Sequence, residues 1–249
     1  MRAESPFQID DLEELHTELF SRADRVVPMH DVACGDTGAN VIGLRHDVDD
    51  NLGSFDTALR MAEWEFERGY SSTYFLLHSS HYWNEEWLGE VPRFEELGHE
   101  VGIHVNAIAE ALRQRVDPHV ILTNALSELR ATGVRVMGCV AHGDQPICRK
   151  ANFCNDELFT ESARPNLGSP DRLIEYEGVI CPLVPVSRKA YQLEYDPNWL
   201  SRGDYLSDSG GKWSQPFEGV CARFGQGQLH VLQHPDWWGE AFVSQEVAA

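Results

Sequence analysis

The chain has 249 residues and a formal net charge of −20, from 40 acidic residues against 20 lysines and arginines. This length allows one large α/β domain that buries a substantial core without disulfides. The negative field repels phosphate backbones and anionic lipid headgroups, so nucleic acid and membrane surfaces are excluded as partners, and a neutral or cationic substrate fits better.

The cysteines and the N-terminal segment bear on location. The six cysteines show no Cys-x-x-Cys spacing, so we expect reduced thiols. The N-terminal segment has no apolar signal core, and no run of the sequence approaches the roughly 18 apolar residues that cross a bilayer. We therefore expect a cytoplasmic protein with no membrane insertion.

Helical and strand patterns alternate along the first two thirds of the chain. In chain order, we expect a helix within 5–23, a strand at 41–46, a helix at 54–69, a strand at 71–77, a helix at 90–98, a strand at 99–103, a helix at 117–133 and a strand at 134–141. Strand and helix in alternation predict a parallel sheet with right-handed crossovers.

The last third is less regular because prolines interrupt it. We expect strands within 174–187 and 190–197, and a final strand at 229–233 that leads into a loop. No linker or internal repeat divides the sequence. The pattern therefore predicts a single domain over residues 1–249, a closed or partly closed β/α barrel, with residues 1–35 as an N-terminal helical extension packed on it.

Acidic and imidazole side chains follow several of the predicted strands directly: Asp47, Asp49, His104, His142 and His234. The carboxyl ends of parallel strands meet at one edge of the sheet, where active groups of such folds lie. Two carboxylates among imidazoles can hold a divalent metal and take a proton from water. The alternative is an acidic turn that caps the next helix, and the histidines at the other strand ends argue against it.

Six short sequence motifs, taken in chain order, add to this evidence. The segments "VIGLRHDVDD", "STYFLL", "GHEVGIH", "VAHG", "YLSDSGGKW" and "VLQHPDWW" span about residues 41 to 238. In this order they resemble the polysaccharide deacetylase family, also called the chitooligosaccharide-deacetylase homology domain. The resemblance is to the branch with Asp-x-Asp in its first motif, which is associated with bacterial surface-polysaccharide biosynthesis. It implies a distorted, incomplete β/α barrel of about seven parallel strands.

The resemblance also implies roles for individual residues. Asp47 matches the catalytic base, Asp49 and His104 match metal ligands, and His234 matches the acid that protonates the leaving amine. Further residues are expected to line or brace the substrate pocket: by resemblance Asp208, Trp213 and Leu232, and, as flat faces for sugar rings beside His234, Trp237 and Trp238.

One position departs from the family pattern. A second metal histidine is usual four residues after the first, and Ile108 occupies that place. Asn106 or His142 completes the coordination sphere, or metal binds weakly, or the protein is no longer an enzyme. Imidazole is the better zinc ligand, so we expect Asp49, His104 and His142. His46 is the reserve candidate, although its place just before Asp47 indicates the opposite face of the strand and a structural role.

Arg45 also departs from the pattern, and the arginine that orients the base in the family is missing from its usual motif. Arg45 would replace it only if its side chain reached round the rim of the barrel. An ion pair with a neighbouring strand is the interpretation that we favour for Arg45.

The expected function is removal of an N-acetyl group from an amino sugar of a glycan or glycan precursor, with one divalent ion, zinc by preference, as cofactor. Two alternatives stay open. The same barrel would also suit hydrolysis of another non-peptide amide C–N bond. A non-catalytic carbohydrate-binding or scaffold protein is the reading that Ile108 favours, although such a protein needs neither a base nor an acid.

Overall fold

The computed structural model describes residues 7–35, 40–51, 53–162, 172–200, 204–225 and 227–243. Its main sheet has seven strands, all paired in parallel, in the order β5-β4-β3-β2-β9-β8, and β1 pairs with the first half of β2. These strands are β1 (Arg25–Val27), β2 (Val41–Val48), β3 (Thr73–Leu77), β4 (Glu100–Val105), β5 (Cys139–Ala141), β8 (Asp204–Ser207) and β9 (Leu229–Gln233).

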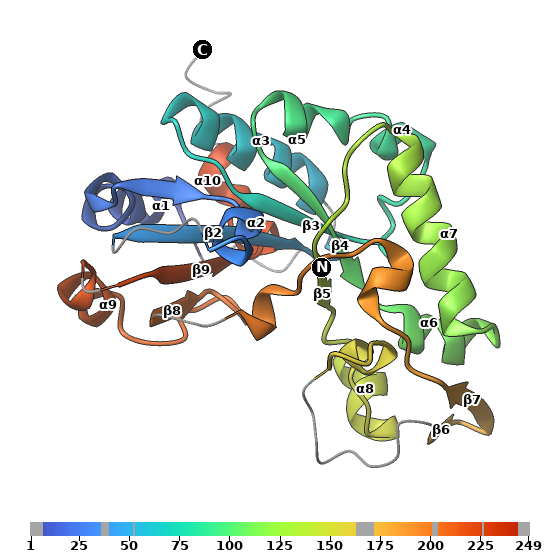
Figure 1. The fold of residues 1–249 in the computed structure, drawn as a ribbon. Coiled ribbons are helices and arrows are strands. Elements are labelled where there is room, and N and C mark those ends of the chain that lie inside the picture. Colours follow the sequence, from blue (N-terminus) through green and yellow to red (C-terminus); the bar gives the residue numbers. More distant parts are fainter. Residues whose placement is uncertain are drawn as a thin grey trace.

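The sheet curls into a half-barrel with helices around it (Figure 1). Within the described part of the chain, β5 and β8 each pair with one strand of this sheet and not with each other, so the barrel stays open. The expected distorted, incomplete barrel of about seven parallel strands is confirmed. The sequence analysis missed β1 and β8, which are too short to show a pattern of their own.

The helices expected within 5–23 and at 54–69, 90–98 and 117–133 are present, and the described part of the chain has six further α-helices that were not expected. Together they are α1 (Ile9–Glu18), α2 (Met29–Ala33), α3 (Ser54–Glu67), α4 (Glu85–Leu88), α5 (Pro92–Glu96), α6 (Ala107–Gln114), α7 (Pro118–Ala131), α8 (Gln145–Ala151), α9 (Phe217–Arg223) and α10 (Gly239–Val243). The start of α7 follows from its sequence, because the Asp117 side chain accepts a hydrogen bond from the His119 amide at 2.7 Å and Pro118 needs no partner there. Among the described helices, none combines the length and apolar character that a bilayer crossing requires.

The last third differs from expectation in one segment. Residues 174–187 contribute to an antiparallel hairpin of β6 (Arg172–Tyr176) and β7 (Val179–Leu183). Residues 190–197 do not form the expected strand, because the 3₁₀ helices η3 (Arg188–Tyr191) and η4 (Pro197–Trp199) take up the two ends of this stretch. Only Tyr195 makes a strand-like bridge there, with Gly138.

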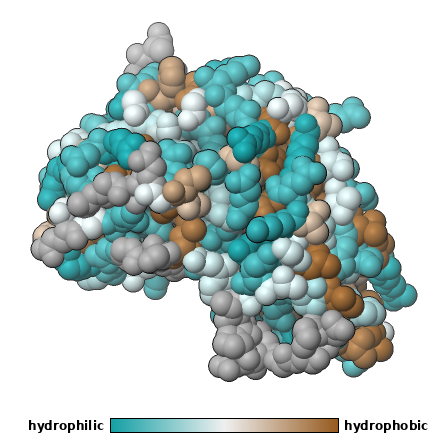
Figure 2. Space-filling model, in the orientation of Figure 1, coloured by the Kyte–Doolittle hydropathy of each residue, from teal (hydrophilic) through white to brown (hydrophobic). Residues whose placement is uncertain are grey.

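The surface is hydrophilic over most of the face in Figure 2, as a net charge of −20 requires. Hydrophobic side chains gather at the lower right, where the hairpin of β6 and β7 lies (Figures 1 and 2). Leu173 and Ile180 of this hairpin are 69% and 59% exposed.

The two sides of the sheet have separate apolar cores. The larger one lies under the helices, and a smaller one fills the barrel with Met29, Phe75, Val140 and Tyr195 among its members. Gly102 of β4 leaves the space that the Phe75 ring occupies. The close packing inside the barrel therefore depends on the absence of a side chain at one position of β4.

We predict that Gly102→Ala lowers the free energy of unfolding by about 1–3 kcal/mol, because the added methyl group overlaps the Phe75 ring and the buried ring has little room to move. Urea denaturation followed by circular dichroism measures this change. Gly227→Ala is the matched control, since no atom lies within 4 Å of the added carbon there. Equal stabilities of the two variants would contradict the packing argument.

Candidate metal centre and active site

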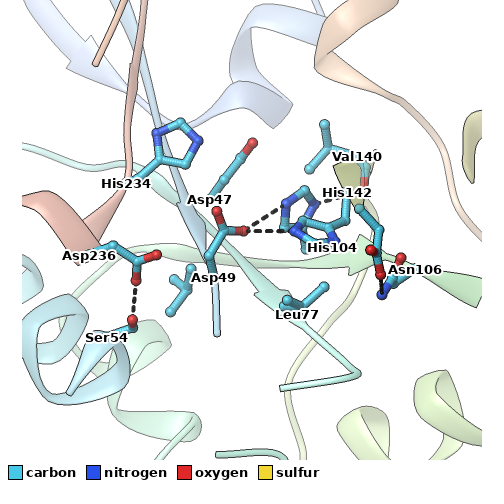
Figure 3. Close-up of polar contacts among 12 residues, drawn as sticks. Asp47, Asp49, Ser54, Leu77, His104, Asn106, Val140, His142, His234 and Asp236 are labelled. Carbon is cyan, nitrogen blue, oxygen red and sulfur yellow. Dashed lines mark hydrogen bonds and ion pairs between the residues drawn. The ribbon is translucent and has the colours of Figure 1, made fainter. Parts of the chain in front are cut away.

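The strand β2 delivers the polar residues at the centre of the site. All eight of its residues, Val41–Val48, are buried, and it pairs with β3 on one edge and β9 on the other. Side chains alternate along a strand, so Arg45 and Asp47 share one face and His46 lies on the other. Asp49 follows at the end of the strand and points toward the histidines of β4 and β5 (Figure 3).

Three of the predicted residues meet at this edge of the sheet. Asp49 Oδ1 lies 3.3 Å from His104 Nε2 and 3.6 Å from His142 Nε2. One ligand atom from each residue lies within 4.8 Å of the others, and among the described residues this is the one such group of three or more metal-binding side chains. The backbone thus brings together the end of β2, the end of β4 and the residue after β5, as Figure 3 shows.

The chemistry of these groups fits a cation. His104 Nδ1 lies 3.1 Å from the Val140 carbonyl, so its N–H is donated there; Nε2 donates toward Asp49 when the ring is protonated and offers a lone pair to a metal when the ring is neutral. Asp49 Oδ1 and His142 Nδ1 are buried atoms without a well-formed hydrogen bond in the described structure. A positive ion between this carboxylate oxygen and the two imidazole nitrogens would give all three a partner.

The charges in the cluster agree with this reading. Burial alone would raise the pKa of Asp49, but the hydrogen bond and charge of His104, with His142 and His234 nearby, outweigh burial and lower it to about 2. The pKa of His142 falls below its usual value because of burial and the neighbouring His104. Asp49 is therefore ionised and His142 is neutral at pH 7, which are the forms that bind metals. Burial would lower the pKa of His104, but the neighbouring Asp47 and Asp49 raise it, so a metal would have to displace a proton from His104.

Asp47 lies beside this cluster with one restraint on its carboxylate. It is 5% exposed, and its Oδ2 lies 3.5 Å from Arg45 Nη2. Arg45 also donates from Nη1 to Asn198 Oδ1 at 3.3 Å. The ion pair that we expected between Arg45 and a neighbouring strand is thus replaced by one within β2, because residues two apart in a strand share a face.

His234 follows β9 and is held by a buried acid. Its Nδ1 lies 2.6 Å from Asp208 Oδ1, and its backbone amide donates to Asp208 Oδ2 at 2.9 Å. Burial would lower the pKa of His234, but the hydrogen bond and charge of Asp208, with Asp47 and Asp49, raise it to about 9. His234 is therefore protonated at pH 7, and its Nε2 carries a proton that it can give away.

The predicted pocket residues have different positions. Asp208 is 0% exposed and also accepts from Trp238 Nε1 at 2.7 Å. Trp238 is 0% exposed and stacks on Phe7, so it offers no face to a sugar ring and instead helps to fix Asp208. Leu232 is buried on β9 opposite Arg45 in the strand register.

Two other predicted pocket residues keep partial exposure. Trp213 and Trp237 are half-buried and pack against the main core. The Trp213 ring lies beside those of Phe7 and Trp238, with centroids 5.2 and 6.1 Å away. Their exposed parts leave them as candidates for a pocket wall.

Ile108 and the alternative candidate ligands, Asn106 and His46, lie outside the metal cluster. Ile108 is 0% exposed in the core. The side-chain amide of Asn106 donates to Ser79 and Asp144. His46 faces away from the cluster, where its Nε2 lies 2.7 Å from Glu65 Oε1 of α3. The interpretation that reserved a structural role for His46 agrees with this contact.

Sequence reasoning missed two acid–base groups near the cluster. His78 directly follows β3, so the rule applied to the other strand ends would have found it. Burial lowers the pKa of His78 to about 4, and its Nε2 accepts a hydrogen bond from the backbone amide of Asn106 at 2.9 Å. Asp236 contacts Ser54, and burial with the nearby Asp49 raises its pKa to about 7 (Figure 3). Its place in the loop after His234 was the available signal.

Comparison with known proteins gives a likeness in fold only. No family model and no curated protein matches the chain. Similar solved structures include the peptidoglycan deacetylase PdaC from Bacillus subtilis, with 15% identity over 84% of this chain and 82% of that chain and a TM-score of 0.41. A CE4 family pseudoenzyme from Bacillus anthracis has 13% identity over 85% of this chain and 60% of that chain, with a TM-score of 0.41.

A third structure is the Xyl-CE4 domain of a multidomain xylanase from the hindgut metagenome of Trinervitermes trinervoides. It has 13% identity over 85% of each chain and a TM-score of 0.40. At these identities and TM-scores, the likeness does not establish an activity for this chain.

We predict that the pair of His234 and Asp208 makes stability depend on pH. The folded state raises the pKa of His234 from 6.5 to about 9, so the stabilisation is complete below pH 6.5 and is lost as the pH rises toward 9. The difference in unfolding free energy between wild type and His234→Gln should shrink by up to about 3 kcal/mol over this range. Urea titrations at several pH values measure it, and a difference that stays constant would contradict the assignment.

Proposed function

We propose that this protein is a zinc-dependent hydrolase that removes the N-acetyl group from an amino sugar. The observation that carries the proposal is the meeting of Asp49, His104 and His142 beside a carboxylate, Asp47, and a protonated imidazole, His234. Amide hydrolysis needs a group that accepts a proton from water and a group that gives one to the leaving nitrogen. A module that only binds sugar needs neither.

Asp49, His104 and His142 are the residues that would hold the ion, since two imidazoles and a carboxylate form a common catalytic zinc set. The side chains of Asp49 and His142 are 27% and 22% exposed, so the cluster is open to substrate on one side. A divalent ion at this place supplies Lewis acidity to the acetyl carbonyl and makes water more acidic.

Asp47 is the proposed base. Its carboxylate accepts a proton from the attacking water while the oxygen of that water bonds to the acetyl carbon. Arg45, 3.5 Å away, keeps the carboxylate in place. Burial of both side chains excludes bulk water, so this electrostatic restraint is stronger than it would be at the surface.

His234 is the proposed acid. When the C–N bond breaks, the Nε2 proton of His234 passes to the nitrogen, and the products are acetate and a free amino sugar. Asp208 holds Nδ1 at 2.6 Å and so fixes which nitrogen faces the substrate. Trp238 holds Asp208 in turn.

The choice of an amino sugar rests on the motifs around Asp47, His104 and His234. A net charge of −20 is also consistent with a neutral sugar substrate and a cationic amine product. Leu232, Trp213 and Trp237 are the candidates for the walls that contact the acetyl group and the sugar rings.

We predict that the protein, saturated with zinc and then dialysed, retains about one ion per chain, and that His104→Ala retains none, because the variant removes a ligand with a fixed tautomer. Metal analysis by mass spectrometry measures this. His30→Ala is the control, since His30 lies in α2 outside the cluster. A metal-free wild-type protein would contradict the proposed function.

We predict that Asp47→Asn keeps the metal but lowers amine release by about 100-fold or more, because the amide cannot accept the proton of water. The assay compares N-acetylated amino-sugar oligomers with small cyclic amides and measures the free amine. Asp50→Asn is the matched control, because Asp50 is exposed and pairs with His81. Release from the cyclic amides alone would assign the site to another C–N bond, and full activity of Asp47→Asn would show that Asp47 is not the base.

A further inference from the structure

Asn155 connects three parts of the site and touches none of the metal-binding atoms. It begins the 3₁₀ helix η2 (Asn155–Leu158) and is 0% exposed. Asn155 lies outside every motif of the sequence. A buried amide has two acceptor and two donor positions that need partners, so its contacts are informative.

The oxygen of Asn155 caps a distant helix. Oδ1 accepts from the Ile108 amide at 3.0 Å and from the Ala109 amide at 3.3 Å, in the first turn of α6. The residue before α6, Asn106, makes no capping hydrogen bond with its own side chain. A residue 47 positions away in the chain thus satisfies backbone donors that a local cap would normally take.

The nitrogen of Asn155 holds the segment of the third proposed ligand. Nδ2 donates to the His142 carbonyl at 3.0 Å and to Asn106 Oδ1 at 3.0 Å. The His142 amide donates to the Val105 carbonyl at 2.9 Å. The backbone of His142 is therefore held on both sides, by β4 through its N–H and by Asn155 through its carbonyl.

The position of His142 explains why such a restraint matters. Asp49 and His104 lie at the ends of long strands, β2 and β4, whereas His142 follows the three-residue strand β5. A ligand on a short strand and loop needs support from other parts of the structure to stay within reach of a metal. Ile108, in the first turn of α6, points into the core and supplies no ligand from the helix.

We propose that Asn155 is a positioning residue that sets the orientation of His142 toward Asp49 and His104, and that it couples this ligand to the N-terminus of α6. The inference rests on the proposed metal site. Asn155 acts through the His142 backbone, and its effect is on metal affinity and coordination geometry.

The test is Asn155→Asp, which has the same shape. The carboxylate keeps an oxygen for the Ile108 and Ala109 amides, and a negative charge is favourable at a helix N-terminus. It loses the donor to His142 and Asn106 and places an oxygen against their oxygens. Asn155→Ser also lacks the amide donors and carries no charge, so it gives the same test if the carboxylate prevents folding.

Two measurements on the full chain follow: zinc affinity by competition with a chelator, and the visible spectrum of the Co²⁺ form. We expect the affinity of either variant to fall about 10–100-fold, with a changed Co²⁺ spectrum and a native circular dichroism spectrum. Asn84→Asp is the matched control, because Asn84 also caps a helix, α4, and donates to a backbone carbonyl, that of His81. It should leave both measurements unchanged.

A double-mutant cycle with His142→Ala separates positioning from general structural damage. If Asn155 acts through His142, the Asn155 substitution has no further effect on affinity once the imidazole is absent. Full additivity would overturn the inference, and so would wild-type affinity and spectrum in folded Asn155 variants. Absence of metal from the wild-type protein would overturn the proposed function together with this inference, whereas the other outcomes bear on Asn155 alone.

Discussion

The central constraint in this structure is that β2 is paired on both edges and buried on both faces. Water has little access to its polar side chains, so each needs a partner from the protein. Alternation sends Arg45 and Asp47 to one side, where they pair, and His46 to the other, where Glu65 receives it. Burial of β2 therefore accounts both for the pairing of Asp47, the candidate base, with Arg45 and for the contact of His46 with Glu65 of α3.

Much of the candidate site could be predicted because it lies at strand ends. The strand at 229–233 was placed at its exact bounds, and the meeting of Asp49, His104 and His142 follows from the rule that parallel strands end at one edge. The same rule pointed to His78, which the sequence analysis passed over. The alternation of side chains along a strand also predicted that His46 lies on the face of β2 opposite to Asp47, because a period of two residues can be read from a sequence.

The rest depends on contacts that leave no periodic signal. The β1 strand is three residues long and exists because β2 offers it an edge. Residues 190–197 have strand composition, but turns at η3 satisfy the backbone of 190–193 locally, and only Glu194 and Tyr195 pair with the segment at 137–139. In the sequence, Trp238 looks like an exposed aromatic residue beside His234. In the fold it stacks on Phe7, from the other end of the chain, and belongs to the core. Asn155 reaches α6 across 47 positions, and only the folded chain reveals such a pair.

Glu65 links helix α3 to the strand that carries Asp47. It lies on α3 with 1% exposure, binds His46 on the far side of the sheet from the pocket, and also accepts from the Ser72 hydroxyl at 2.7 Å. His46 and Asp47 share one peptide bond, so the depth at which α3 sits on the sheet also sets the position of the pocket carboxylate. A substitution that shifts this helix would therefore be expected to affect the candidate site as well as stability, although Glu65 contacts none of Asp49, His104 and His142.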